Sequence, residues 1–180
     1  ISTDKAAPPV NHIYGLSKAM MERMFCSLDY STETNFSCVR FGNIAWSTGS
    51  VFPIWKRMME SNNLIESTGS NMKRFIFSVD EAADLVLTCI KNIHLTKGKI
   101  LSQKMKSAKI LDVLEAWKDY VGTEWVPIQQ RVGETIDEVI IGSSEVSNTI
   151  IIPIDTKEYF LTSTREVYED CIEEKFYTGN

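Results

Sequence analysis

Several features that would reveal a function directly are scarce in this chain of 180 residues. It has only two histidines, His12 and His94, and neither stands in an arrangement typical of a catalytic triad. The four cysteines form no Cys-x-x-Cys pair and have no histidine at metal-ligand spacing. This predicts no metal site and favours reduced, buried thiols in a cytoplasmic protein.

Long apolar runs and basic clusters are missing as well. No apolar run approaches the ~20 residues that cross a bilayer, so we expect no membrane span. The 19 Lys and Arg residues are scattered among 24 Asp and Glu residues, which argues against a nucleic-acid partner. The four tryptophans have no basic neighbours in a pattern for base stacking, so we expect them in a core or an interface.

Glycine-rich phosphate loops are also absent. The nine glycines are isolated, and no Gly-x-Gly-x-x-Gly motif occurs, so we expect no cradle for a dinucleotide pyrophosphate in this chain. The sequence starts at Ile1, without methionine, in a stretch that resembles the end of a buried strand. We interpret the chain as a fragment of a longer protein.

Hydrophobic periodicity predicts alternating helices and strands, the pattern of an α/β fold. Helices are expected at residues 11–30, 51–60, 80–93 and 110–121. Ser78 and Glu81 should form a capping box, and the last of these helices should start behind Ser107 and stop near Gly122. Strands are expected at the start and at 36–41, 75–77, 99–101, 124–130, 149–154 and 159–162, with an acidic helix at the end.

Tyr14 and Lys18 form a Tyr-x-x-x-Lys pair on the first predicted helix. A spacing of four places both side chains on one face, so they can act on one ligand. An ammonium beside a phenol favours the phenolate, which could take a proton from a sugar hydroxyl. By itself the pair is more often a solvated helix face.

The run Thr3-Asp4-Lys5 stands at the carboxyl end of the opening strand, where α/β enzymes place catalytic groups. A turn capped by Asp4 is the alternative reading of this run. Its occurrence just before the Tyr14 and Lys18 pair favours a catalytic role.

The segments STDKAAPPVNHIYGLSK, VRFGN, TGSVFPIWK, MKRF and RVGE occur in that order. Together they closely resemble the polysaccharide-biosynthesis UDP-N-acetylglucosamine 4,6-dehydratases, over about residues 1–142. The resemblance implies the carboxyl-terminal part of a Rossmann-type extended short-chain dehydrogenase/reductase fold, with a smaller substrate-binding α/β domain. Residues 1–50 would end the NAD(P)-binding portion, 51–142 would bind mainly the nucleotide sugar, and 143–180 remain unassigned.

The resemblance also implies a reaction. The sugar is oxidised at C4, loses water across C5 and C6, and receives the hydride back at C6, so NAD or NADP is regenerated. Lys5 would be the base at C5, Asp4 the acid at C6, and Thr3 the partner of the C4 oxygen. For this role Lys5 must be neutral, through burial or the nearby charge of Lys18, either of which would depress its pKa.

Further site residues follow from the same resemblance. Tyr14, Lys18 and Phe41 would contact the cofactor. The UDP-sugar would be held by Asn43, Ser50, Val51, Lys56, Arg74, Arg131 and Glu134. The family also implies a homo-oligomer.

Three departures bear on the substrate. The stretch between Lys5 and Tyr14 is one residue longer than usual, Thr48 replaces a common Arg, and Thr135 and Asp137 replace an expected Lys and His. Tyr14 favours the soluble, C5-inverting type over relatives that carry Met there.

Two alternatives stay open at this point. A nucleotide-sugar epimerase or reductase would keep the Tyr and Lys pair but has no use for Asp4 and Lys5. A non-catalytic nucleotide-sugar binding module would bind UDP without turning it over.

Overall fold

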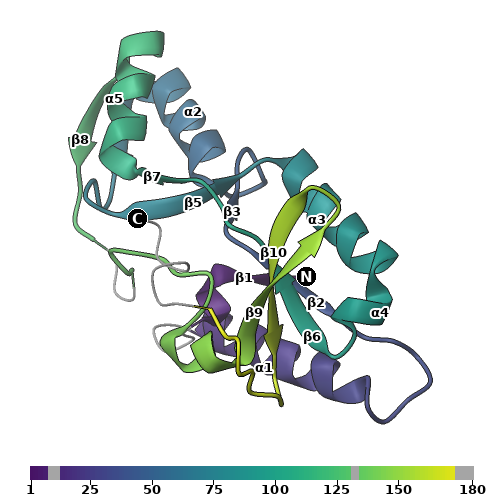
Figure 1. The fold of residues 1–180 in the computed structure, drawn as a ribbon. Coiled ribbons are helices and arrows are strands. Elements are labelled where there is room, and N and C mark those ends of the chain that lie inside the picture. Colours follow the sequence, from purple (N-terminus) through teal and green to yellow (C-terminus); the bar gives the residue numbers. More distant parts are fainter. Residues whose placement is uncertain (8–12, 131–133, 173–180) are drawn as a thin grey trace.

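The computed structural model describes residues 1–7, 13–130 and 134–172, and its centre is a five-stranded mixed sheet (Figure 1). In spatial order its strands are β1 (Ser2–Thr3), β2 (Cys38–Phe41), β6 (Lys99–Ser102), β10 (Lys157–Ser163) and β9 (Thr149–Ile154). The first three run parallel, and β10 lies antiparallel between β6 and β9. Two long helices flank the sheet, α1 (Ile13–Leu28) and α3 (Val79–Lys91).

β2 directs alternate side chains to opposite faces of this sheet. Arg40 meets Glu22 of α1, whereas Val39 and Phe41 lie in the core cluster that contains Leu85 of α3. The two helices therefore cover opposite faces. This explains why all four residues of β2 are buried although the strand does not alternate between apolar and polar residues.

The apolar side of α1 is not the buried side. Its buried residues are Gly15, Glu22 and Cys26, and Glu22 is there because it pairs with Arg40. The residues whose spacing predicts the helix are 37–84% exposed, namely Ile13, Leu16, Met20, Met24 and Leu28.

A second group of elements lies at the upper left of Figure 1. It contains a three-stranded sheet of β3 (Asn43–Ile44), β5 (Lys73–Phe77) and β7 (Ser107–Lys109), and a two-stranded one of β4 (Leu64–Ser67) and β8 (Glu124–Pro127). Helices α2 (Val51–Asn62) and α5 (Ile110–Val121) pack around a core that includes Trp55, Ile65 and Leu114.

Most predicted elements are present within a few residues. Ser78 and Glu81 form the expected capping box of α3, and Gly122 ends α5 in the left-handed conformation. The expected cap at Ser107 is wrong, because this residue belongs to β7 and Lys109 precedes the helix. No acidic helix forms before Ile172, and the residues beyond it lie outside the described part of the chain. Short elements that were not expected are β3, β4, β7, α4 (Ile93–Thr96) and the 3-10 turns η1 (Asp4–Ala6) and η2 (Ser143–Asn148).

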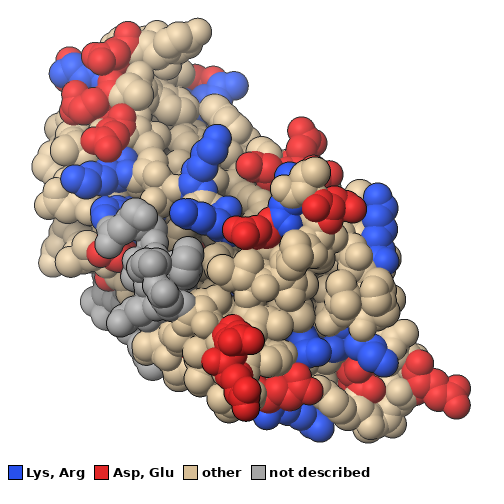
Figure 2. Space-filling model, in the orientation of Figure 1, with Lys and Arg blue, Asp and Glu red and all other residues tan. Residues whose placement is uncertain are grey.

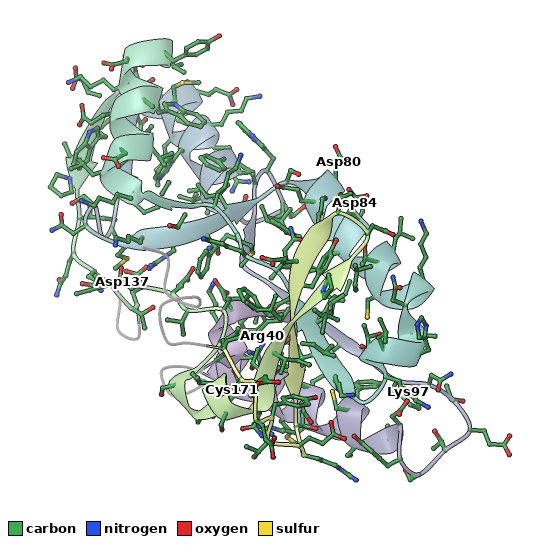
Figure 3. All side chains as sticks on the ribbon, viewed as in Figure 1. Arg40, Asp80, Asp84, Lys97, Asp137 and Cys171 are labelled. Atoms are coloured by element: carbon green, nitrogen blue, oxygen red, sulfur yellow. The ribbon has the colours of Figure 1, made fainter. Side chains whose placement is uncertain are left out.

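Arg40 ties three distant segments together in the interior (Figure 3). All five of its N–H donors are used, on both carboxylate oxygens of Glu22, both of Glu145 and the carbonyl of Ile140, at 2.7–3.0 Å. The guanidinium outweighs burial and holds the pKa of Glu145 below its usual value. The segment around η2 is thereby fixed to α1 and β2.

Acidic and basic side chains are interspersed on the face drawn in Figure 2. All four cysteines are free; Cys26, Cys38 and Cys89 are buried as expected, but Cys171 is exposed. In residues 1–7, 13–130 and 134–172 no helix has the length and apolar character needed to cross a membrane.

Candidate active site

A cavity of about 280 Å³ opens at the carboxyl ends of β1 and β2. We call it the smaller cavity. The predicted catalytic residues Thr3, Lys5, Tyr14 and Lys18 line it together with Phe41. Asp4 is buried directly behind them, with its side chain fully enclosed. Residues predicted from two separate motifs thus converge on one space, while their roles remain predictions.

η1 and α1 position these groups. Thr3 caps η1 and donates a hydrogen bond of 2.9 Å from its hydroxyl to Asp4 Oδ1. On α1, Lys18 Nζ lies 5.9 Å from the ring centre of Tyr14 and donates a 3.0 Å hydrogen bond to the carbonyl of Ile1. This bond joins the helix to the opening strand, so the two motifs keep their relative position.

Lys5 is held by three acceptors. Its Nζ lies 3.1 Å from Asp4 Oδ1, 3.0 Å from Glu138 Oε1 and 3.3 Å from Asn43 Oδ1. Burial lowers the pKa of Lys5, but the carboxylates of Asp4 and Glu138 outweigh burial and raise the pKa above its usual value. The expected neutral Lys5 with a depressed pKa is therefore wrong for this structure, because the sequence did not reveal the second carboxylate.

Glu138 is a member of this site that sequence reasoning missed. It follows Asp137, which marks its loop in Figure 3, and its side chain is only 8% exposed. Besides Lys5 it contacts the Asn43 amide at 3.0 Å and Arg74 Nε at 3.5 Å. Burial and the charge of Asp4 raise the pKa of Glu138 to about 7. In the sequence Glu138 directly follows a second acidic residue, Asp137, so the local pattern does not single it out as a site residue.

A larger cavity of about 420 Å³ adjoins the smaller one, and the two share Asn43 and Ile44 in their walls. Among its lining residues are the predicted substrate contacts Asn43, Ser50, Val51, Arg74 and Glu134. Ser50 precedes α2, and its hydroxyl oxygen is buried without a hydrogen-bond partner among the described residues. A ligand in this cavity could supply that partner.

The remaining substrate predictions fare differently. Lys56 does not line the larger cavity; it is about half exposed and lies 3.9 Å from Glu60. Arg131 lies outside the described residues. Arg74 lines the larger cavity, but its guanidinium donates hydrogen bonds to backbone carbonyls, among them those of Lys73 in β5 and Thr135 in the region after β8.

Gly42 connects β2 to β3 in the wall of the smaller cavity. A Cβ at this position would come 2.5 Å from Phe75 Cβ and 3.2 Å from Asp4 Oδ2. The close approach of the β2–β3 connection to β5 therefore requires glycine here. This contact brings Asn43, at the start of β3, next to Lys5.

Comparison with known proteins identifies the family of this chain. Residues 1–158 match the family described as "Polysaccharide biosynthesis protein". The chain belongs to this family. The match extends beyond residue 142, so it includes β9 and reaches β10, which the sequence motifs did not cover.

Two curated relatives of this family member have different activities. The UDP-N-acetylglucosamine 4,6-dehydratase (inverting) of Campylobacter jejuni is 32% identical over 149 residues, which are 81% of this chain and 43% of the relative. The UDP-glucose 4-epimerase of Rickettsia rickettsii is 31% identical over 183 aligned residues, 93% of this chain and 53% of the relative. The chain spans about half the length of the curated relatives it matches.

Solved structures confirm the expected fold class. Pen from Bacillus thuringiensis matches with a TM-score of 0.83 and 25% identity, covering 99% of this chain and 56% of that one. DesIV, a dTDP-glucose 4,6-dehydratase from Streptomyces venezuelae with NAD and TYD bound, matches with a TM-score of 0.64 and 12% identity. This match covers 75% of this chain and 48% of DesIV. The chain has the Rossmann-type α/β fold of extended short-chain dehydrogenases/reductases.

Proposed function

We propose that this chain is the substrate-binding and catalytic part of an NAD(P)-dependent nucleotide-sugar 4,6-dehydratase that acts on UDP-N-acetylglucosamine. The observation that carries the proposal is the convergence of Thr3, Lys5, Tyr14 and Lys18 on one cavity, with Asp4 behind them. A carboxyl, two amines and a phenol around one sugar ring provide the groups that dehydration requires.

The residues present fit the nicotinamide end of the cofactor. Ser2 lines the smaller cavity, and its buried hydroxyl has no hydrogen-bond partner among the described residues. Tyr14 and Lys18 lie in the same wall, where they would hold the nicotinamide ribose. When bound, NAD or NADP supplies the acceptor for the hydride from C4 and its donor to C6. No glycine-rich motif for the pyrophosphate occurs in these 180 residues.

The chain's own groups divide the proton transfers between them. Tyr14 takes the proton of the C4 hydroxyl, and Thr3, after its hydroxyl turns away from Asp4 Oδ1, donates a hydrogen bond to the oxygen that becomes the ketone. The ketone acidifies the C5 proton, which Lys5 removes, while Asp4 protonates the departing C6 hydroxyl. Lys5 first passes its own proton to Asp4, whose Oδ1 lies 3.1 Å from Lys5 Nζ, because its carboxylate neighbours favour the ammonium at the start of the reaction. This transfer leaves a neutral amine at Lys5 and a protonated carboxyl at Asp4.

The larger cavity would take the UDP moiety. Ser50 and Val51 at the start of α2 would face the diphosphate, where a helix N-terminus and a hydroxyl with no partner favour an anion. Glu134, which accepts a hydrogen bond from Thr68, would accept others from the uridine ribose. Asn43, in both cavity walls, would contact the sugar between them.

The test is product analysis in heavy water with the complete gene product that carries this chain. A 4,6-dehydratase yields a 4-keto-6-deoxy sugar that is lighter by one water and carries solvent deuterium at C5. Lys5→Ala should abolish water loss and leave UDP affinity nearly intact. Normal product formation by this variant would remove Lys5 from the mechanism.

A 4-epimerase is the second candidate, because the Rickettsia rickettsii relative aligns over 93% of the chain. It would give a product of unchanged mass without deuterium at C5, and Lys5→Ala would spare it. Isothermal titration of the 180-residue chain with UDP and with NAD(P) tests a third reading. UDP binding without turnover by the complete product would indicate a binding module.

A further inference from the structure

Glu138 is a buried carboxylate in direct contact with Lys5. Its two carboxylate oxygens are divided between partners: Oε1 contacts Lys5 Nζ at 3.0 Å and Arg74 Nε at 3.5 Å, and Oε2 accepts from Asn43 Nδ2 at 3.0 Å. These partners come from η1, β5 and β3. A single carboxylate thus joins three elements of the site.

The amide of Asn43 completes a closed arrangement. Its Oδ1 accepts from Lys5 Nζ at 3.3 Å, and its Nδ2 donates to Glu138 as well as to the carbonyl of Phe75 at 3.1 Å. The orientation of the amide is therefore fixed by three contacts. Lys5 is therefore held by Glu138 directly and by Asn43, whose amide Glu138 helps to orient.

Charges near Lys5 balance within the cluster. Asp4 and Glu138 are the two carboxylates that face the Lys5 ammonium, and Arg74 lies on the other side of Glu138. Lys18 lines the same cavity but donates its hydrogen bond to the carbonyl of Ile1. Without Glu138, one buried acid would face two cations, and Lys5 would lose its shortest contact.

Glu138 lines neither of the two cavities, although its partners Lys5, Asn43 and Arg74 do. It contacts the cavity walls through these three residues. We propose that Glu138 is a positioning residue of the dehydration proposed above: it fixes the Lys5 amine at the wall of the smaller cavity, with Asn43 as its second support. The effect on dehydration rests on the proposed function. The contacts that fix Lys5 do not, because they are present in the structure itself.

The kinetic test compares Glu138→Ala and Glu138→Gln in the complete gene product with UDP-N-acetylglucosamine. The alanine variant should lower kcat by about 10- to 100-fold, since a displacement of ~1 Å of a reacting group has an effect of this order. KM should change by a smaller factor than kcat, because Ser50, Val51 and Glu134, the proposed contacts of the UDP moiety, lie apart from the contacts of Glu138. Glu138→Gln, which keeps an acceptor oxygen for Lys5, should recover part of kcat.

A second readout does not need turnover. With 13C-labelled lysine, NMR titration of the Lys5 side chain should show a lower pKa in Glu138→Gln than in the wild type, since an opposite charge has been removed. Glu124→Gln is the matched control: it removes the carboxylate 2.7 Å from Lys118 on the exposed surface. It should leave both kcat and the Lys5 titration unchanged.

The outcomes separate this inference from the proposed function. If the wild-type protein yields no dehydrated product, the proposed function fails, and an unchanged Lys5 pKa in Glu138→Gln would then also sink the role of Glu138. If the wild type dehydrates its substrate but Glu138→Ala keeps its kcat within twofold, only the positioning role fails. Should the alanine variant not fold, as judged by circular dichroism, Glu138→Gln decides by both measurements.

Discussion

Glu22→Gln should destabilise the protein by about 3 kcal/mol, because breaking a buried ion pair costs ~3–5 kcal/mol. Arg40 is 1% exposed and the Glu22 side chain 3%, so water cannot replace the lost carboxylate. Glu22 accepts both Nε and Nη2 of Arg40, at 2.8 and 2.7 Å. Glu145 still neutralises the guanidinium in the variant, which places the cost at the lower end of the range.

Urea unfolding followed by circular dichroism measures this loss. With a slope of ~2 kcal/mol per molar urea, a loss of 3 kcal/mol moves the midpoint down by about 1.5 M. Glu60→Gln is the control, because Glu60 is 57% exposed and lies 3.9 Å from Lys56, so its midpoint should move by less than about 0.3 M. A Glu22→Gln midpoint as close to the wild type as that of the control would refute the assignment of Arg40 as a buried anchor.

Three further predictions concern single side chains. The pKa of Glu138 is raised to about 7 in the folded protein, above that of an unfolded carboxyl, so the free energy of unfolding falls as pH rises from 4.5 to 7. Glu138→Gln lacks this ionisation, so its urea midpoint should rise relative to that of the wild type between pH 5 and pH 8. A constant difference between the two midpoints would contradict this. Ser78→Ala should cost about 1 kcal/mol in thermal unfolding, because Glu81 N–H loses its cap. Gly42→Ala should lower both Tm and UDP affinity, since its Cβ would collide with Phe75; an unchanged Tm would mean that β2 and β5 can separate freely.

The long helices could be predicted because their signals are local. The capping box of Ser78 and Glu81 and the glycine at 122 mark helix ends within a few residues of sequence. Which side of α1 is buried could not be predicted in this way. Glu22 is inside only because Arg40, on a strand that follows later, supplies its countercharge. β7, which reads Ser-Ala-Lys, has no alternating pattern and exists through its pairing with β5.

In the candidate site, too, the residues with local sequence motifs could be predicted and the one brought in by a long-range contact could not. Thr3, Lys5, Tyr14 and Lys18 come from two motifs close together in the sequence, and the structure brings all four to one cavity. Glu138 joins them from far along the chain, through a loop without periodicity, so no local signal announces it. The misjudged pKa of Lys5 is a consequence of the same long-range contact.

β10 is the last strand in sequence order among the described residues, yet it stands between β6 and β9 in the main sheet. While the chain emerges from a ribosome, β6 keeps an open edge until Lys157–Ser163 has been translated. Glu138, the last of the described site residues in the sequence, is translated before the strand that closes the main sheet. A premature stop after residue 142 would therefore release a chain with an unpaired strand, prone to pair with a second nascent copy rather than to work as a smaller protein.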